Sequence, residues 1–437
     1  MQALKTIFMA LAFVTLAQPV AAIGILRDAG IEHGLRQLAA PILRAAGLSS
    51  GSVQILLVDD SSLNAFVVDH QHIFMTTGLL LKLDNAAMFQ AVIAHEAAHI
   101  ANGHLARRAG NARAARNAAG MGVLLAGIAA ASGGGKASAG LALGAASSAY
   151  RVLLSHSRAE EASADQSSVR YMVQAGVDPQ GAVDVHQMFR GQEALSAARQ
   201  DPYARTHPLS SDRARALSGF VAAYGKSVKP NPTADYWFAR AQGKLSAHQR
   251  NPKWTLRRSP KSMTADIRAM REAVAWHQRA NLKMALPLID QALKIRPKDA
   301  YYWDLKGEIL LKSRQPKAAV SAYANAVKLG GNDAIILGGY GRALLASGQI
   351  RPALKALETA RARDFNNSGI LRDLAVAYAK TGNKGMASLV TAERYALQGR
   401  LKDAEIHAKR ASDLLPRGSG PWQRAQDVLS AAKRVKK

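Results

Sequence analysis

The sequence predicts a chain in two parts: an α+β domain with one small sheet, followed by an all-α solenoid of helical repeats. Short apolar segments set between turn residues predict the sheet. A 34-residue spacing of small side chains in the second half predicts the repeats. A stretch rich in proline and glycine, "YGKSVKPNPTADY", separates the two parts. We therefore expect domains over residues 23–232 and 235–437, after a leader over residues 1–22.

The leader has the build of a secretory signal peptide. Lys5 gives it a basic start, the apolar run that follows is too short to span a membrane, and small residues allow cleavage after Ala22. The chain contains no cysteine, which excludes a disulfide framework and a lipid-bearing cysteine. These features predict an exported protein of the bacterial periplasm.

The first half alternates helix and strand patterns. "GILRDAGIEHGLRQLAAPILRAAG" predicts an amphipathic helix closed by glycine. "SVQILLVDD", "NAFVV" and "HIFMTT" predict three strands, and "NAAMFQAVIAHEAAHIANGHLARR" predicts one long alanine-rich helix. We expect a further helix within residues 155–179, ended by Gly176 and Pro179.

Residues 118–150 form an alanine- and glycine-rich segment whose first eighteen positions are uncharged. Six of those eighteen are glycine and only five are Met, Val, Leu or Ile, which is a weak pattern for a membrane span. We favour a mobile helical hairpin beside the functional site, in contact with a membrane surface or free of it, and a true membrane span is the alternative.

The second half repeats itself. Ala285, Ala319, Ala353 and Ala387 follow one another at intervals of 34 residues. Such a period with small residues at helix crossings resembles the tetratricopeptide repeat, a helix–turn–helix unit. The unit "AERYALQGRLKDAEIHAKRASDLLP" begins half a period late, so the register slips there. We expect about four repeats.

The net charge of +27 is concentrated in these repeats. Residues 1–234 hold 20 Lys and Arg against 15 Asp and Glu, whereas residues 235–437 hold 38 against 16. A basic half suggests nucleic acid in a cytosolic protein, but export and the lack of interleaved aromatic residues argue against that partner. Anionic lipid headgroups or acidic protein surfaces fit better. Solvated helix faces are the plain alternative.

The stretch "HEAAHIANGH" holds the residues that predict chemistry. His95 and His99 are four apart, so on a helix they share one face about 6 Å from each other. Two imidazoles so placed can bind one zinc ion. Glu96 lies beside them, where it can take a proton from a metal-bound water. The alternative is a polar patch on a solvated helix, which the apolar flanks argue against.

A third ligand has to come from elsewhere. His104 lies five residues after His99, whereas the long zinc signature needs six. His70 and His72 flank a predicted turn, so we expect none of these three to bind the metal.

Two carboxylates downstream fit better. Glu161 and Asp165 are four apart on one predicted helix face, which suits a carboxylate ligand with a second carboxylate that holds a ligand histidine. The adjacent Glu160 would point elsewhere. A solvated acidic face is the alternative.

These motifs together resemble a known family. "HEAAH", "SRAEEASAD" about sixty residues later, "NAF" and "GLL" before them and "THPLSSDR" after them are similar to the M48 family of zinc metallopeptidases, over roughly Arg27 to Leu217. The repeats and the leader narrow the resemblance to the periplasmic beta-barrel assembly-enhancing branch. The resemblance implies a zincin-like (gluzincin) fold and one Zn²⁺. It also implies site residues: His95, His99 and Glu161 as zinc ligands, Glu96 as general base and Asp165 behind the ligands.

His207, in "RTHPLSSDR", matches a histidine that the resemblance implies to cap the zinc and keep the enzyme latent. A fourth imidazole on zinc would displace the catalytic water and would have to move for turnover. A histidine that stabilises the tetrahedral oxyanion is an equal alternative. A turn histidine before Pro208 is the plain structural one.

We therefore expect an exported zinc endopeptidase that hydrolyses misfolded or stalled envelope and outer-membrane proteins. The resemblance implies that its repeats dock on outer-membrane assembly machinery and substrates. The edge of the "NAF" strand could pair with the main chain of an extended substrate. The alternative is a periplasmic repeat scaffold or chaperone with a latent or inactive peptidase half. Nucleic acid is not an expected partner.

Overall fold

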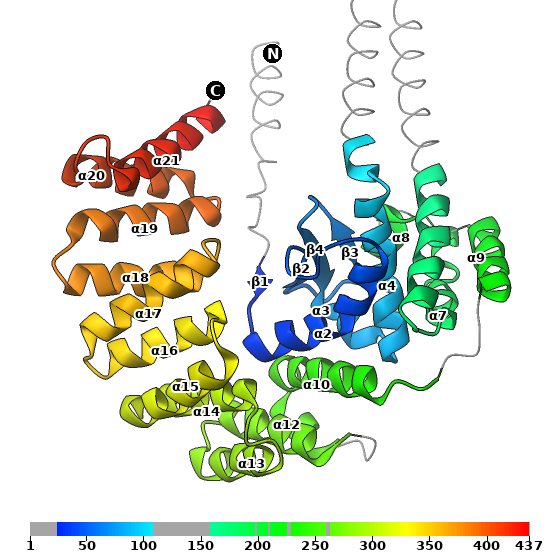
Figure 1. Ribbon diagram of the computed structural model, residues 1–437, viewed down its shortest axis with the longest axis horizontal. Coiled ribbons are helices and arrows are strands. Elements are labelled where there is room, and N and C mark those ends of the chain that lie inside the picture. The colour runs from blue at the N-terminus through cyan, green and yellow to red at the C-terminus, as the bar shows by residue number, and fades with distance from the viewer. Residues whose placement is uncertain are drawn as a thin grey trace, which may run out of the picture.

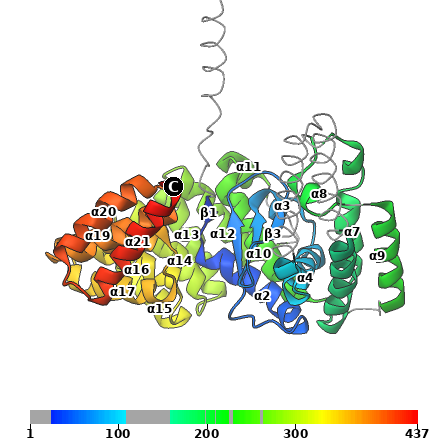
Figure 2. The ribbon, with the colours of Figure 1, turned by 90° about the horizontal axis from the view of Figure 1, so that it is seen from above.

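The computed structural model describes residues 24–107, 158–196, 199–208, 210–224, 229–258 and 263–436. The predicted leader and the alanine- and glycine-rich segment over 118–150 lie outside these residues. A small sheet with its helices is followed by a helical solenoid that rises beside it (Figure 1). Seen from above, the two parts lie side by side (Figure 2). The α+β class of the first part and the all-α class of the second are as predicted.

The described sheet has four strands in the order β1-β2-β4-β3. They are β1 (Ile25–Leu26), β2 (Gln54–Val58), β3 (Ala65–Val67) and β4 (His72–Thr76). β2 runs parallel to β4, whereas β1 and β3 are antiparallel to their neighbours. The three predicted strands are present. β1 was wrongly assigned to the start of the first helix, because two residues are too short to show a strand pattern. β3 and β1 form the two edges of this sheet.

The helices of the first part pack one apolar face on this sheet. α2 (Ala29–Ala45) begins where the Asp28 side chain accepts a backbone hydrogen bond, and α4 (Ala86–Ala101) begins in the same way at Asn85. Both helices contribute to one core with the strands. The remaining helices are α3 (Thr77–Lys82), an unlabelled helix over residues 158–174, α7 (Gln180–Met188), the short η1 (Gln192–Ala194), α8 (Pro202–Thr206) and α9 (Ser211–Tyr224).

Glycines in the left-handed conformation end helices in this part, and two of them bear on the sequence-based predictions. Gly176, with φ of +67°, follows the helix over residues 158–174, where the sequence predicted an end. Gly103, with φ of +69°, interrupts what the sequence predicted as one long helix, so that α4 stops at Ala101 and a new helical segment begins at His104. Only glycine takes this left-handed conformation at little cost. The turn at Gly103 therefore changes the direction of the chain, and the His104 side chain contacts His99 on α4.

The solenoid is built from antiparallel helix pairs that stack in sequence order. Its helices are α10 (Pro232–Gln249), α11 (Pro252–Arg257), α12 (Ala265–Gln278), α13 (Leu282–Ile295), α14 (Ala300–Lys312), α15 (Pro316–Gly330), α16 (Ala334–Ala346), α17 (Ile350–Arg363), α18 (Ser368–Lys380), α19 (Lys384–Leu397), α20 (Leu401–Leu414) and α21 (Gly420–Lys436).

Five helices of the solenoid, α12, α14, α16, α18 and α19, are each followed by a residue with positive φ. These positions are Ala280, Arg314, Gly348, Gly382 and Gly399. At each turn the next backbone N–H reaches back to the last helical turn, as in a Schellman motif; the Asn281 N–H, for example, lies 3.0 Å from the Trp276 carbonyl. The first four positions keep the 34-residue period, whereas the last follows at half that distance. The structure therefore contains the predicted register slip, and α19 packs against both α18 and α20.

α10 belongs to the packing of both parts. Phe238 and Leu245 are buried in the core of the sheet domain, whereas Ala247 is buried with the first repeat helices. The Gln242 side chain donates hydrogen bonds to the carbonyls of Leu80 and Leu83, at 3.0 and 2.7 Å. Because one helix contributes to two cores, the solenoid is held against the sheet domain. None of the helices in the described residues is long and apolar enough to cross a membrane.

Candidate metal centre

Four buried side chains that can donate to a metal converge in the sheet domain. His95 and His99 come from α4, Glu161 comes from the helix over residues 158–174, and His207 directly follows α8. One ligand atom from each lies within 4.8 Å of the ligand atoms of the others. The structure thus brings together the three residues predicted as metal ligands and places His207 with them.

The distances within this group suit one tetrahedral ion. Nε2 of His99 lies 3.1 Å from Nε2 of His95. Oε2 of Glu161 lies 3.2 Å from Nε2 of His95 and 3.1 Å from Nδ1 of His207. Donor atoms at about 2 Å from a tetrahedral zinc ion are roughly 3.3 Å apart. Three imidazole nitrogens and one carboxylate oxygen at these separations therefore fit a tetrahedral metal ion, and such donors are ones that zinc takes.

Local sequence explains how α4 carries its histidines into the interior. Ala94, Ala97 and Ala98 are fully buried, so the helix packs closely against its neighbours and His95 and His99 are buried with it. A buried polar ring is costly unless its nitrogens have partners. Each ring therefore needs a partner on Nδ1, the nitrogen that does not face the donor group.

Each of these rings has a partner on its Nδ1. Oδ1 of Asp165 lies 3.2 Å from Nδ1 of His95, in the place predicted for a carboxylate behind the ligands. Nδ1 of His104 lies 2.9 Å from Nδ1 of His99. Such contacts fix the orientation and tautomer of ligand histidines. The contact of His104 with His99 was not predicted from the sequence; Gly103 was the signal for it, because a helix break there returns the chain toward α4.

Arg213 is a further residue that the sequence analysis missed. Its Nε and Nη2 donate to the two oxygens of Asp165 at 2.8 and 2.9 Å, and its Nη1 donates to the Pro208 carbonyl at 2.7 Å. The side chain is only 8% exposed. One guanidinium thus holds the carboxylate behind His95 and the backbone beside His207. A buried carboxylate needs a cation, and the arginine of "THPLSSDR" was the signal for it.

The charges of this centre suit metal ligation. Burial acts to raise the pKa of Glu161, but the surrounding His207, His95 and His99 rings hold it well below its usual range. Burial lowers the pKa of His99 to about 3, so that this ring is neutral. Burial also acts to lower the pKa of His95, but Asp165 and Glu161 raise it to about 10. Metal ligands have to be deprotonated, so metal binding and proton release are coupled at His95.

Glu96 and His207 lie against each other beside the donor group. Oε1 of the fully buried Glu96 is 3.3 Å from Nε2 of His207. The same Nε2 lies 3.2 Å from the carbonyl oxygen of Ala65 on the edge strand β3. The Tyr203 ring stacks obliquely on the His207 ring, with centroids 4.7 Å apart. The His207 ring is therefore enclosed by the donor group, Glu96 and the sheet edge.

Three further polar side chains considered from the sequence lie outside the donor group. His72, the first residue of β4, pairs with Asp69 at 2.9 Å, and His70 is exposed in the turn before it. Glu160 is buried but directed toward Arg107, at 3.8 Å.

Comparison with known proteins agrees with the two resemblances that were predicted from the sequence. Residues 27–221 match the model of Peptidase family M48, and residues 310–372 match a tetratricopeptide repeat model. The beta-barrel assembly-enhancing protease of Yersinia pestis is 25% identical over 80% of this chain and 72% of its own length. The protein of that name from Escherichia coli K12 is 25% identical over 83% of this chain and 75% of its own length.

Solved structures of repeat proteins are similar to part of this chain. A crystal structure of MamA is 17% identical, covers 38% of this chain and 97% of its own, and has a TM-score of 0.30. YrrB, described as a TPR protein with an unusual peptide-binding site, is 18% identical, covers 44% of this chain and 89% of its own, and has a TM-score of 0.30.

Proposed function

We propose that this chain, in which a family M48 metallopeptidase domain precedes tetratricopeptide repeats, is an exported zinc endopeptidase that acts on misfolded or stalled envelope proteins. The observation that carries the proposal is the buried group of His95, His99 and Glu161 with Glu96 beside it. The name shared by the relatives, beta-barrel assembly-enhancing protease, supports outer-membrane proteins as substrates.

The residues around the centre have separate tasks in this proposal. His95, His99 and Glu161 hold the ion, and Asp165 and His104 hold the two rings in place. When bound, zinc lowers the pKa of a coordinated water and polarises the carbonyl of the peptide. Glu96, beside the donor group, would accept a proton from the attacking water on its carboxylate and return it to the leaving amine.

In this proposal His207 is a latch. Its Nδ1 stands at the fourth corner of the donor group, so that four protein donors leave no corner for water or substrate. Its Nε2 also contacts the Ala65 carbonyl, on the strand edge where an extended substrate would pair. The ring has to leave both places for turnover. An oxyanion stabiliser is the alternative, because a ring beside Glu96 could also reach the reacting carbonyl.

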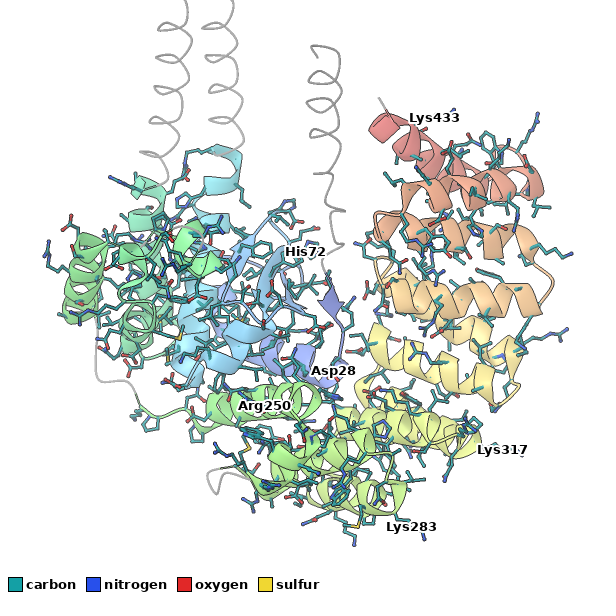
Figure 3. All side chains as sticks on the ribbon, turned by 180° about the vertical axis from the view of Figure 1, so that it is seen from behind. Asp28, His72, Arg250, Lys283, Lys317 and Lys433 are labelled. Atoms are coloured by element: carbon teal, nitrogen blue, oxygen red, sulfur yellow. The ribbon has the colours of Figure 1, made fainter. Side chains whose placement is uncertain are left out.

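The remaining parts of the proposal concern place and partners. The basic first residues and the small residues before position 23 support export to the periplasm. The repeats supply a surface for substrate or for the outer-membrane assembly machinery, and exposed cations such as Lys283 and Lys317, on the outer side of the solenoid in Figure 3, support peripheral contact with anionic membranes.

Hydrolysis by the Glu96→Gln variant tests the function. The variant keeps the three ligands and loses the group that takes the proton, so kcat/KM for unfolded casein should fall by about 10² to 10⁴. Zinc content should stay as in the parent chain. Unchanged hydrolysis would overturn the role of Glu96. If the parent itself neither binds zinc nor cleaves, while both proteins suppress aggregation of an unfolded substrate, the chain is the alternative repeat scaffold.

A further inference from the structure

A cavity lies where the start of the sheet domain meets the repeats. Its volume is about 600 Å³, within the usual range for ligand pockets. The turn from β1 into α2 forms one wall, and the first helices of successive repeats, α14, α16 and α18, form the other. Asp28 marks this junction in Figure 3. No residue of the metal centre lines the cavity.

Most charged groups around this cavity have a partner. Four ion pairs account for them: Arg27 with Asp364 at 2.7 Å, Lys244 with Asp28 at 2.8 Å, Lys312 with Glu308 at 2.5 Å, and Arg342 with Asp373 at 2.6 Å. These pairs satisfy one another and demand no ligand.

Asp304 is different. Its side chain is only 7% exposed and lines the cavity, and within the described part of the chain no group pairs or hydrogen-bonds with it. Burial raises the pKa of this carboxyl well above its usual range, with Lys244 opposing the effect. Its carboxyl faces the cavity, where a ligand can supply the hydrogen bonds and the positive charge that the described residues do not supply.

His248 supplies a second unsatisfied group at the same place. It lines the cavity from α10, and its buried Nε2 has no hydrogen-bond partner among the described residues. Burial lowers the pKa of this ring, which is therefore neutral and can accept a hydrogen bond on one nitrogen. The cavity thus presents a carboxyl and an imidazole that both lack a donor.

Asp304 is the charged group that the cavity leaves without an ion pair. The acidic lining residues Asp28, Asp304 and Glu308 equal the basic lining residues Arg27, Lys312 and Arg342 in number, and all of these except Asp304 have an ion-pair partner among the described residues. A carboxyl without an ion pair beside a second acceptor favours a ligand group that is positive and rich in donors. Ammonium and guanidinium groups have both properties.

We propose that this cavity binds a lysine or arginine side chain of an extended polypeptide, with Asp304 as its counter-ion and His248 as a second acceptor. β1 lies at the edge of the sheet that faces the repeats in Figure 1, so main-chain groups for an extended ligand are close at hand. The inference deepens the proposed function, since it names a side chain by which the repeats select substrate, and it rests on that function for the choice of polypeptide as ligand.

Peptide binding by the full chain tests the inference. Fluorescein-labelled peptides Gly-Ser-Val-X-Val-Ser-Gly, with lysine, arginine or norleucine at X, are titrated by fluorescence anisotropy against the Glu96→Gln chain, which prevents cleavage. The lysine and arginine peptides should bind about tenfold more tightly than the norleucine peptide. Asp304→Asn should bring the three affinities to within about twofold of one another.

Asp290→Asn is the matched control. Asp290 also comes from a repeat helix but is half-exposed, pairs with Lys306 and does not line the cavity, so the preference for a cation should persist. Thermal denaturation separates binding from folding, because removal of an unsatisfied acid should leave the melting temperature of Asp304→Asn equal or higher.

Three results would overturn the inference. The first is no preference for the cationic peptides, which includes no binding of any peptide. The second is the same preference in Asp304→Asn, and the third is a lowered melting temperature of that variant. Zinc content and casein hydrolysis are measured on separate samples, so failure of the proposed peptidase is distinguishable from failure of this site.

Discussion

Nε2 of His207 lies 3.2 Å from the carbonyl oxygen of Ala65, the first residue of the edge strand β3. The opposite nitrogen of the same ring lies 3.1 Å from Oε2 of Glu161. One side chain therefore occupies a corner of the donor group and a backbone acceptor of the sheet edge at the same time. Metal access and strand access are coupled through this ring.

His207→Ala tests that coupling. Removal of the ring opens the fourth corner and the strand edge together, so casein hydrolysis should rise by about tenfold if the closed form predominates at rest. His72→Ala, at the start of β4 and outside the donor group, should leave the rate unchanged. A fall in hydrolysis for His207→Ala would rule out the latch and favour an oxyanion stabiliser.

Metal content distinguishes two adjacent glutamates. We expect about one zinc per chain by elemental mass spectrometry of the purified parent protein. Glu161→Ala removes a donor and should weaken zinc binding by at least about 100-fold. Glu160→Ala changes a side chain directed toward Arg107 and should keep the metal. Equal zinc in both variants would exclude Glu161 as a ligand, and a parent that takes up no zinc would exclude the metal centre.

Arg213→Lys tests a residue that positions the ligands. Lysine keeps the charge but cannot bind both oxygens of Asp165 or hold the Pro208 carbonyl at the same time. Zinc affinity, measured by competition with a chromogenic chelator, should fall by about 10- to 100-fold. Arg215→Lys, on the exposed side of α9, is the control. An unchanged affinity in Arg213→Lys would show that this arginine only fills space.

The stability of the chain should depend on pH through Asp304. Because its pKa in the folded state is raised, its contribution is most favourable below the pKa of an ordinary carboxyl and is lost as the pH rises through the raised value. Asp304→Asn lacks this dependence. The gain in unfolding free energy of the variant over the parent should therefore grow with pH, to about 1 to 3 kcal/mol. Urea denaturation from pH 4 to pH 8 measures it, and a gain that shrinks with pH would contradict the assignment.

The metal ligands were predicted from the short-range spacing of residues in the sequence. His95 and His99 share a face because a helix turns once in about 3.6 residues, and Glu161 and Asp165 do so for the same reason. The period of 34 residues likewise identified the solenoid, because each repeat packs on its sequence neighbours. The step from Gly382 to Gly399 is seventeen residues, half of the period, as expected for the register slip predicted from the sequence.

Three other features of the structure could not be predicted from a regular spacing of residues. His104 reached His99 because Gly103 breaks the helix, and Arg213 reached Asp165 from a separate helix, 48 residues along the chain. β1 became a strand only because Ile25 and Leu26 found β2 as a partner.

The sequence alone thus determined the two-part architecture, the helical repeats and the side chains that can hold a metal, because each depends on residues within one or two helical turns or on a regular period. Tertiary structure alone decided that the His207 ring also contacts the edge of β3, that α10 contributes to two cores and that Asp304 faces a cavity without an ion-pair partner. These depend on which distant surfaces meet and on which polar groups burial leaves unsatisfied, and no local pattern encodes either.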